Sequence, residues 1–266
     1  MYTTILARSI AGIKHGFFLQ SEKNCKARNM PELPEVETVS KHLQCLVEQT
    51  IKHIAIHRPK LRYLIDPKQK QQLPMQIVKS IQRRGKYIIV TLSQDQLIIH
   101  LGMSGVLRIF DQAPPLQKHD HIVVSFENGQ TLILNDPRRF GAWIFTSCAH
   151  DHPLIAKLGP EPLSKDFNAE YLYQICQKKR LAIKKVLMDS HVVVGIGNIY
   201  ANEALFQSGI HPLSLSCNIS LQHCQKLYQA CVSILEQAIA KGGTTLKDFK
   251  KTDGKPGYFS QELMVY

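Results

Sequence analysis

Three features that would assign a chain to a special structural class are missing from these 266 residues. The chain has no run of about 18 apolar residues, which a membrane-spanning helix requires. Its seven cysteines are scattered and odd in number, and no two form a C-x-x-C pair, so they predict neither a disulfide framework nor a zinc site. It has no internal repeat and no low-complexity tract. We therefore expect a globular, cytoplasmic protein without a membrane partner.

Acidic residues are also scarce. The chain has 21 Asp and Glu against 33 Lys and Arg, which gives a net charge of +12 and a pI near 9.4. Residues 1–29 hold five basic side chains and one acidic one, a net charge of +4, so the rest of the chain still carries 12 − 4 = +8. A surplus of this size predicts a polyanionic partner, most often nucleic acid.

The first half of the chain has the pattern of a β-sheet protein. Short β-branched runs predict strands, and Asn128-Gly129 between the last two of them predicts a tight hairpin. Strands this short, with turns between them, favour a sandwich or a barrel-like sheet. Before them, apolar residues at helical spacing predict a helix. The expected strands are 86–92, 97–101, 121–126 and 131–134, and the expected helix is 31–47.

The second half has a helical pattern. A segment rich in Gly and Pro, 158–163, predicts a linker between two domains, and residues 242–262 read as a long polar loop. The fold class that follows is α+β, with a β-sandwich first and an all-α domain second. The expected helices are 166–178, 183–189, 198–208 and 219–241.

The sharpest chemical candidate is the segment Met-Pro-Glu-Leu-Pro-Glu-Val-Glu-Thr at 30–38. If translation starts at Met30 and the Met is removed, Pro31 becomes a secondary amine that can attack an electrophilic carbon. Glu32 beside it could then protonate the reacting sugar. If the chain begins at Met1, Pro31 is an ordinary amide. A simpler interpretation is a helix start, with proline and acids in the first turn.

Three further motifs come from the sheet half. Lys86 lies in a basic turn, Gln-Arg-Arg-Gly-Lys-Tyr at 82–87, and could pair with a phosphate or shuttle a proton; a solvated strand edge is the alternative. Met103 and Phe140 lie in two glycine-bounded turns, His-Leu-Gly-Met-Ser-Gly at 100–105 and Asp-Pro-Arg-Arg-Phe-Gly at 136–141. Apolar wedges and arginine fill the space left by an extruded nucleotide, although such residues also belong to cores.

Two motifs suggest phosphate binding. Gly-Ile-Gly-Asn-Ile-Tyr at 195–200 opens a predicted helix, whose free N–H groups could bind an anion, although an N-cap by Asn198 explains it equally. Basic residues that include Lys179 crowd the helices just before it. Lys-His-Asp-His at 118–121 has too few ligands for a metal site, so we interpret it as a polar loop in which His119 is available to a phosphate.

Taken in order, these segments resemble one family. From Met30 to Tyr266 the chain is similar to bacterial formamidopyrimidine-DNA glycosylase, which removes 8-oxoguanine and ring-opened purines from duplex DNA. Leu-Gly-Pro-Glu-Pro-Leu at 158–163 and Gly-Gly-Thr-Thr-Leu-Lys-Asp-Phe at 242–249 add to the resemblance. It implies an N-terminal β-sandwich flanked by helices, 31–160, a helix–two-turn–helix domain, 161–241, and a lesion-capping loop with the C-terminal end, 242–266.

The resemblance also implies roles. Pro31 would be the nucleophile at C1′, Glu32 the proton donor and Lys86 the proton donor of β-elimination. DNA contacts would come from His119, Arg138, Lys179 and Asn198. The void-filling residues would be Met103, Arg138 and Phe140, and the lesion loop would carry Lys247 and Tyr258. The implied activity is base-excision repair by a monomeric glycosylase and apurinic-site lyase acting on double-stranded DNA.

Two departures from the family pattern bear on activity. The family continues after Leu-Met-Val-Tyr with a four-cysteine zinc finger, which carries an arginine linked to δ-elimination; this chain stops at Tyr266, so we expect no metal and no cofactor in it. Residues 1–29 block Pro31 unless they are a leader or a miscalled start. An impaired or inactive DNA-lesion binder is therefore the alternative. The related endonuclease VIII branch is disfavoured by the motif at 31–36 and by the set Met103, Arg138 and Phe140.

Overall fold

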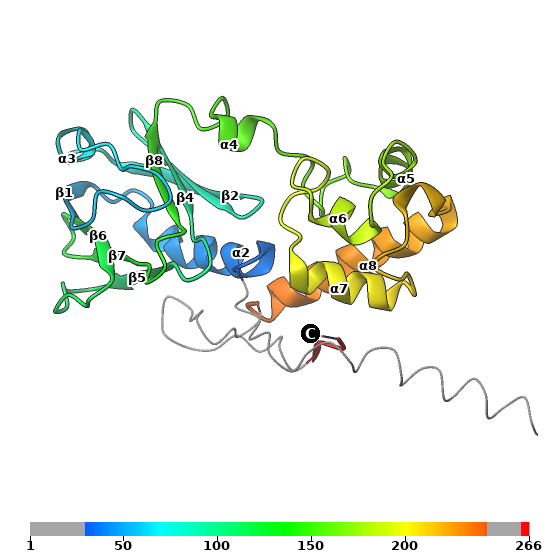
Figure 1. Ribbon diagram of the computed structural model, residues 1–266. Coiled ribbons are helices and arrows are strands. Elements are labelled where there is room, and N and C mark those ends of the chain that lie inside the picture. Colours follow the sequence, from blue (N-terminus) through cyan, green and yellow to red (C-terminus); the bar gives the residue numbers. More distant parts are fainter. Residues whose placement is uncertain (1–29, 244–261, 266) are drawn as a thin grey trace, which may run out of the picture.

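The computed structural model describes residues 30–243 and 262–265, which form a sheet lobe and a helical lobe (Figure 1). The sheet lobe opens with α2 (Leu33–His42), which runs into the 3-10 turn η1 (Leu43–Leu46). Two antiparallel four-stranded sheets follow. One has the order β1 (Ile51–Ile56), β6 (Asp120–Phe126), β7 (Thr131–Asn135), β5 (Val106–Phe110), and the other β2 (Val78–Arg84), β3 (Tyr87–Leu92), β4 (Gln96–His100), β8 (Ala142–Thr146).

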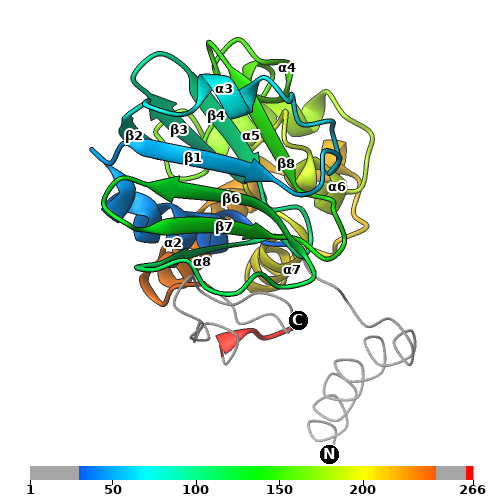
Figure 2. The same cartoon turned by 90° about the vertical axis from the view of Figure 1, so that its left-hand side faces the viewer.

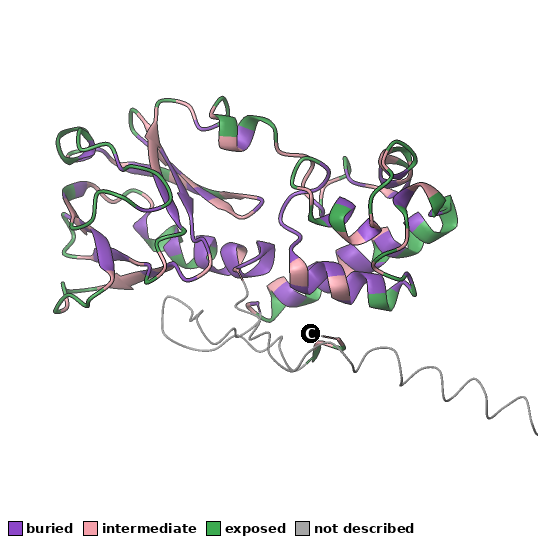
Figure 3. Cartoon of the chain, in the orientation of Figure 1, coloured by how far each residue is buried: buried purple, intermediate pink, exposed green. Residues whose placement is uncertain are grey.

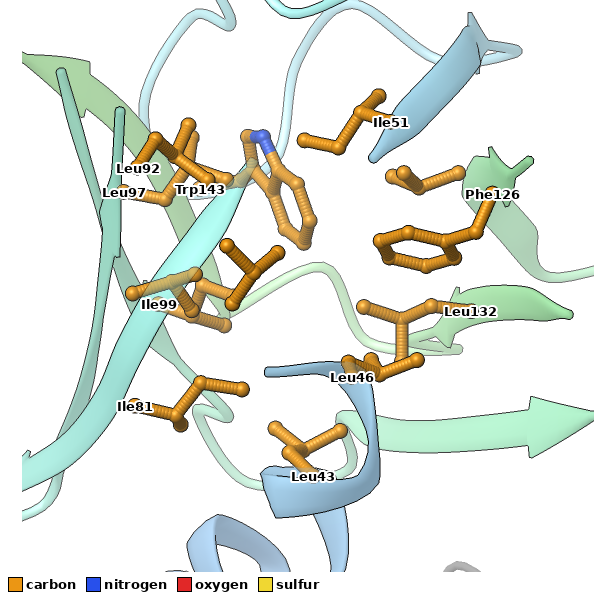
Figure 4. Close-up of a pocket in the computed structure, with 13 residues that line it drawn as sticks. Leu43, Leu46, Ile51, Ile81, Leu92, Leu97, Ile99, Phe126, Leu132 and Trp143 are labelled. Carbon is orange, nitrogen blue, oxygen red and sulfur yellow. The ribbon is translucent and has the colours of Figure 1, made fainter. Parts of the chain in front are cut away.

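The two sheets enclose one apolar core. Figure 2 shows strands β1, β6 and β7 of the first sheet side by side. Alternate residues of each strand point inward, because side chains of a strand face opposite sides with a period of two. The only tryptophan, Trp143, is buried there, and its indole N–H donates to Gln69 Oε1 at 2.9 Å. Gln69 begins the short helix α3 (Gln69–Gln72). A cavity of about 20 Å³ remains between the sheets, lined by apolar side chains alone (Figure 4).

The helical lobe has its own core, between four helices and a short 3-10 turn. Along α7 and α8, buried stretches alternate with more exposed ones (Figure 3). The described helices are all too short or too polar to cross a membrane. After the short helix α4 (Pro153–Ala156), the elements are α5 (Ala169–Gln177), α6 (Ile183–Met188), α7 (Asn198–Gln207), η2 (Ser216–Asn218) and α8 (Leu221–Ala240).

The expected α+β fold is confirmed, and so are the four named strands, the hairpin at Asn128-Gly129 and the four later helices. The basic turn predicted at 82–87 is shorter than expected. Residues 82–84 are the end of strand β2, and the turn consists of Gly85 and Lys86 alone. The basic side chains there suggested a turn, but Arg83 and Arg84 pair with acids from elsewhere in the chain. Most of the predicted loop 242–262 lies outside the described residues.

Glu161 joins the two lobes. One of its carboxylate oxygens accepts from the Gly85 N–H at 2.7 Å and from Arg84 at 2.9 Å, and the other accepts from Arg83 at 2.6 Å. Arg84 also donates to the backbone oxygens of Leu158 and Gly159. The segment predicted as a linker is therefore held against the β2–β3 hairpin, and the hairpin tip is fixed where it faces the helical lobe.

Candidate active site

The site is built around the start of α2. Glu32 is the N-cap residue of this helix, and its backbone N–H donates to the Glu35 carboxylate at 2.9 Å in a capping box. The next N–H, of Leu33, donates to the Gly195 oxygen at 3.0 Å, across to the helical lobe. Pro31 is buried beside them. The helix-start interpretation of this motif is therefore correct.

The Glu32 side chain reaches the N-terminus of α7. Its carboxylate accepts from the backbone N–H groups of Gly197 at 2.6 Å, Ile199 at 2.8 Å and Tyr200 at 3.4 Å. The first N–H groups of a helix have no partner within it and carry partial positive charge, so a carboxylate is stabilised there. The group that accepts these hydrogen bonds is thus the side chain of Glu32, which lies 165 residues before Gly197 in the chain.

This geometry corrects the assignment of Asn198 as the N-cap. Gly197 is the N-cap residue and Asn198 is the first residue of α7, where its side chain is half-buried. A β-carbon on Gly197 would lie 2.5 Å from the Glu32 carboxyl carbon and 2.6 Å from Lys86 Nζ. Glycine is therefore required here by close approach, and the spacing shows that Glu32 and Lys86 meet at this one point.

Burial changes the acidity of Glu32. The loss of hydration raises the pKa of this carboxyl from 4.5 to about 7, while the nearby Lys86 charge and the helix N–H groups act in the opposite direction. A carboxyl with a pKa near 7 holds a proton for part of the time at neutral pH and can give it up, which suits a general acid. Lys86, at the tip of the β2–β3 hairpin, is only half-buried and so is open to a ligand.

Glu35 and Tyr200 form a second contact between α2 and α7, beside that of Glu32. Glu35 is fully buried and accepts from the Tyr200 hydroxyl at 2.8 Å as well as from the Glu32 N–H. Tyr200 lies on α7, so this bond ties α2 to the same helix that binds the Glu32 side chain. Sequence reasoning missed Glu35 and Tyr200. The spacing of Glu32 and Glu35 as a capping box was a local signal for the first, but no signal along the chain pointed to the second.

The two glycine-bounded turns lie against each other. A β-carbon on Gly102 would lie 2.4 Å from the Phe140 backbone, and Ser104 bridges the turns by donating to Asp136 at 2.7 Å and accepting from the Arg138 N–H at 3.1 Å. The Arg138 guanidinium stacks over the Phe140 ring at 4.9 Å. Phe140 is 47% exposed, so its interpretation as a core residue is wrong; the turn leaves it outside the sandwich. Met103 is half-buried.

The remaining candidates are scattered. His119 is half-buried and stands edge-on to His121. The polar loop predicted at 118–121 ends early, because Asp120 already begins β6 and is held by Arg108. Lys179 pairs with Asp189 at 3.3 Å. Within the described ranges, no three His, Cys, Asp or Glu side chains are grouped as a metal site would require. Lys247 and Tyr258 lie outside the described residues.

Comparison with known proteins agrees with this architecture. Residues 30–143 match the model of the formamidopyrimidine-DNA glycosylase N-terminal domain, and residues 158–250 match that of its H2TH domain. The formamidopyrimidine-DNA glycosylases of Escherichia coli O6:H1 and Shigella boydii serotype 18 are each 51% identical over 238 residues, which cover 89% of this chain and 88% of the relative. The chain belongs to the formamidopyrimidine-DNA glycosylase family.

Solved structures of the family have the same fold. The wild-type Lactococcus lactis Fpg (MutM) in complex with DNA containing N7-benzyl-Fapy-dG superposes with a TM-score of 0.82 at 34% identity, covering 89% of this chain and 88% of that one. The MutM (Fpg) protein of Thermus thermophilus gives a TM-score of 0.79 at 33% identity, with 89% and 87% covered. In this member of the family, Glu32, Lys86 and the start of α7 come together where the two lobes meet.

Proposed function

We propose that this protein excises oxidised purines, such as 8-oxoguanine and formamidopyrimidines, from duplex DNA and then cleaves the strand. The observation that carries the proposal is the Glu32 carboxyl, buried with a pKa near 7, adjacent to Pro31 in the chain and close to Lys86. The basic surplus of the chain supports a DNA substrate. So does the Lactococcus lactis relative, whose structure was solved with lesion-containing DNA.

In the proposed first step, the nitrogen of Pro31, as a free secondary amine, attacks C1′ of the damaged nucleoside. Protonated Glu32 gives its proton to the ring oxygen of the sugar as the ring opens. The C1′–N bond to the base breaks, and the base leaves with its bonding electron pair and takes up the proton that the Pro31 nitrogen loses. An iminium ion then links Pro31 to the sugar. In the next step, loss of a proton from C2′ expels the 3′-phosphate by β-elimination, with Lys86 as the proton donor. A second elimination then releases the 5′-phosphate, and water hydrolyses the remaining iminium ion, which frees the Pro31 amine.

The other site residues receive roles as DNA contacts. The phosphates of the DNA would be bound by His119, Asn198 and Lys179. Lys179 would leave its ion-pair partner Asp189 to contact a phosphate. Met103, Arg138 and Phe140 would fill the gap left by the extruded base. Two observations support the last role: the exposed Phe140 ring, and a buried Arg138 Nη1 that has no hydrogen-bond partner among the described residues. The nucleophile and the two proton donors named here belong to a single copy of this chain.

The test is borohydride trapping on a duplex that contains 8-oxoguanine. Protein that starts at Met30, and so exposes Pro31 after removal of the Met, should form a covalent adduct with the DNA. Protein that starts at Met1 should form none, because an amide nitrogen has no free electron pair. If the two folded proteins both fail to react, the chain is a lesion binder without catalysis. An adduct of equal yield from both would show that another amine is the nucleophile.

A further inference from the structure

A second surface lies beside the 136–141 turn, to whose Gly141 oxygen the Arg62 N–H donates at 3.0 Å. The segment 57–68 connects β1 to α3, and α3 stands at the end of the sheet lobe away from α7 (Figures 1 and 2). It borders a groove of about 600 Å³ whose walls include Ile56, Pro59, Leu64 and Pro67. None of these residues has a role in the proposed excision of a base.

The groove is already formed without a ligand. The Ile65 N–H donates to the Pro59 oxygen at 2.8 Å, which closes the loop on itself. Leu61 and Ile65 are 5% and 3% exposed and pack into the sandwich core. On the far side, Gln69 is anchored by Trp143. A surface fixed in this way loses little conformational entropy when it binds a partner, which favours binding.

The rim of the groove is apolar and exposed. The Leu64 side chain is 75% exposed and Tyr63 is 38% exposed, and Pro59 and Pro67 are exposed beside them. The loop and α3 are coloured largely as exposed in Figure 3. Single exposed apolar residues are common, but several around one groove mark an interaction site.

The same surface is positively charged. Arg58, Lys60, Lys68 and Lys70 are exposed, and among the described residues none of the four has an ion-pair partner. The one acidic residue of the segment, Asp66, uses its carboxylate to accept from the Lys68 backbone N–H at 2.9 Å. Unpaired charge of a single sign around an apolar groove is complementary to an acidic ligand with apolar side chains.

We propose that this groove binds a short acidic peptide segment of a partner protein, with one or two apolar side chains seated between Pro59 and Leu64. Duplex DNA would satisfy the basic rim but has no side chain to cover Leu64. Weak, transient partners bind through small surfaces of this kind.

The test uses the full chain and a short fluorescent peptide in which Asp and Glu surround one Leu and one Phe. Fluorescence anisotropy at low salt should show saturable binding that weakens as salt is added. Replacing Leu and Phe of the peptide by Ser should weaken binding about tenfold, and so should Leu64→Asp or the double change Lys60→Glu and Lys70→Glu in the protein.

The matched control is Leu213→Asp, which changes a residue 72% exposed on the helical lobe and should leave peptide binding unchanged. Thermal unfolding should be the same for all variants, since every changed side chain is exposed. Equal peptide binding by the Leu64 and Leu213 variants would overturn the proposal. It would also be overturned if the peptide failed to bind while an undamaged duplex bound in a manner sensitive to Lys60 and Lys70, because the surface would then belong to DNA.

Discussion

Replacing Gly197 by alanine tests the geometry of the site most directly. The backbone of Gly197 is extended, with φ −128°, so alanine introduces no torsional strain. The added methyl carbon would lie 2.6 Å from Glu32 Oε1 and from Lys86 Nζ, whereas contacts below 3.0 Å do not persist. The Lys86 ammonium lies at the end of a flexible chain and can move. Glu32 is buried on all sides, so it can move only by leaving the N-terminus of α7.

Gly197→Ala should lower both the stability of the protein and the rate of the first chemical step. Overpacking of a filled site destabilises a protein by about 1–3 kcal/mol. Displacing the general acid removes a contribution of roughly 10²–10⁴ to the rate of the first chemical step. Gly197→Ala should therefore lower the single-turnover rate of adduct formation far more than its effect on stability would explain, because most molecules remain folded at 25 °C even after a loss of this size.

The assay is borohydride trapping with protein that starts at Met30, paired with thermal unfolding of the same variant. The control is Gly209→Ala, just beyond the other end of α7: its φ of +70° makes alanine strained by about 1–2 kcal/mol, but nothing lies within 4 Å of the new methyl group. That variant should lose stability and keep its trapping rate. If Gly197→Ala reacted at the wild-type rate, the contact between the Glu32 carboxylate and the N-terminus of α7 would not matter for catalysis.

Three further predictions concern stability. The raised pKa of Glu32 means that the native state holds this proton more tightly than the unfolded chain, so relative to Glu32→Gln the free energy of unfolding should be highest below pH 4.5 and fall by about 3 kcal/mol as the pH rises through 7. Glu161→Ala leaves Arg83 and Arg84 without this carboxylate and should cost about 2–4 kcal/mol in urea unfolding. Val90→Ile should fill part of the core cavity and raise the free energy of unfolding by about 1 kcal/mol, seen as a higher Tm.

Each of these has its own check. A pH dependence shared by Glu32→Gln would assign the titration to another group. Glu48→Ala removes an exposed ion pair with Lys79 and should cost less than about 1 kcal/mol, so equal losses for Glu48 and Glu161 would show that the interlobe contact is no stronger than a surface pair. A lower Tm for Val90→Ile would mean that the cavity in the sandwich cannot accept a methyl group.

Much of the fold follows from local patterns. Strand alternation, the Asn128-Gly129 turn and the helical spacing in the second half depend on neighbours within a few residues, which the sequence displays directly. Strands β1, β2, β5 and β8 were harder to name. The β2 sequence Val-Lys-Ser-Ile-Gln-Arg-Arg does not look like a strand, because its arginines suggest an exposed turn. They belong to a strand because Glu37 and Glu161, which lie far away in the chain, neutralise their charge.

The sequence by itself determined the family, the motif around Pro31 and the set of candidate residues, because motifs in order need no knowledge of contacts. Tertiary structure alone decided that the Glu32 carboxylate accepts from the first N–H groups of α7, that Gly197 must be a glycine, and that Phe140 faces outward. It also decided the acidity of Glu32. A pKa near 7 comes from burial between two lobes whose residues lie 165 positions apart in the chain, and no local pattern specifies how much water such a contact removes.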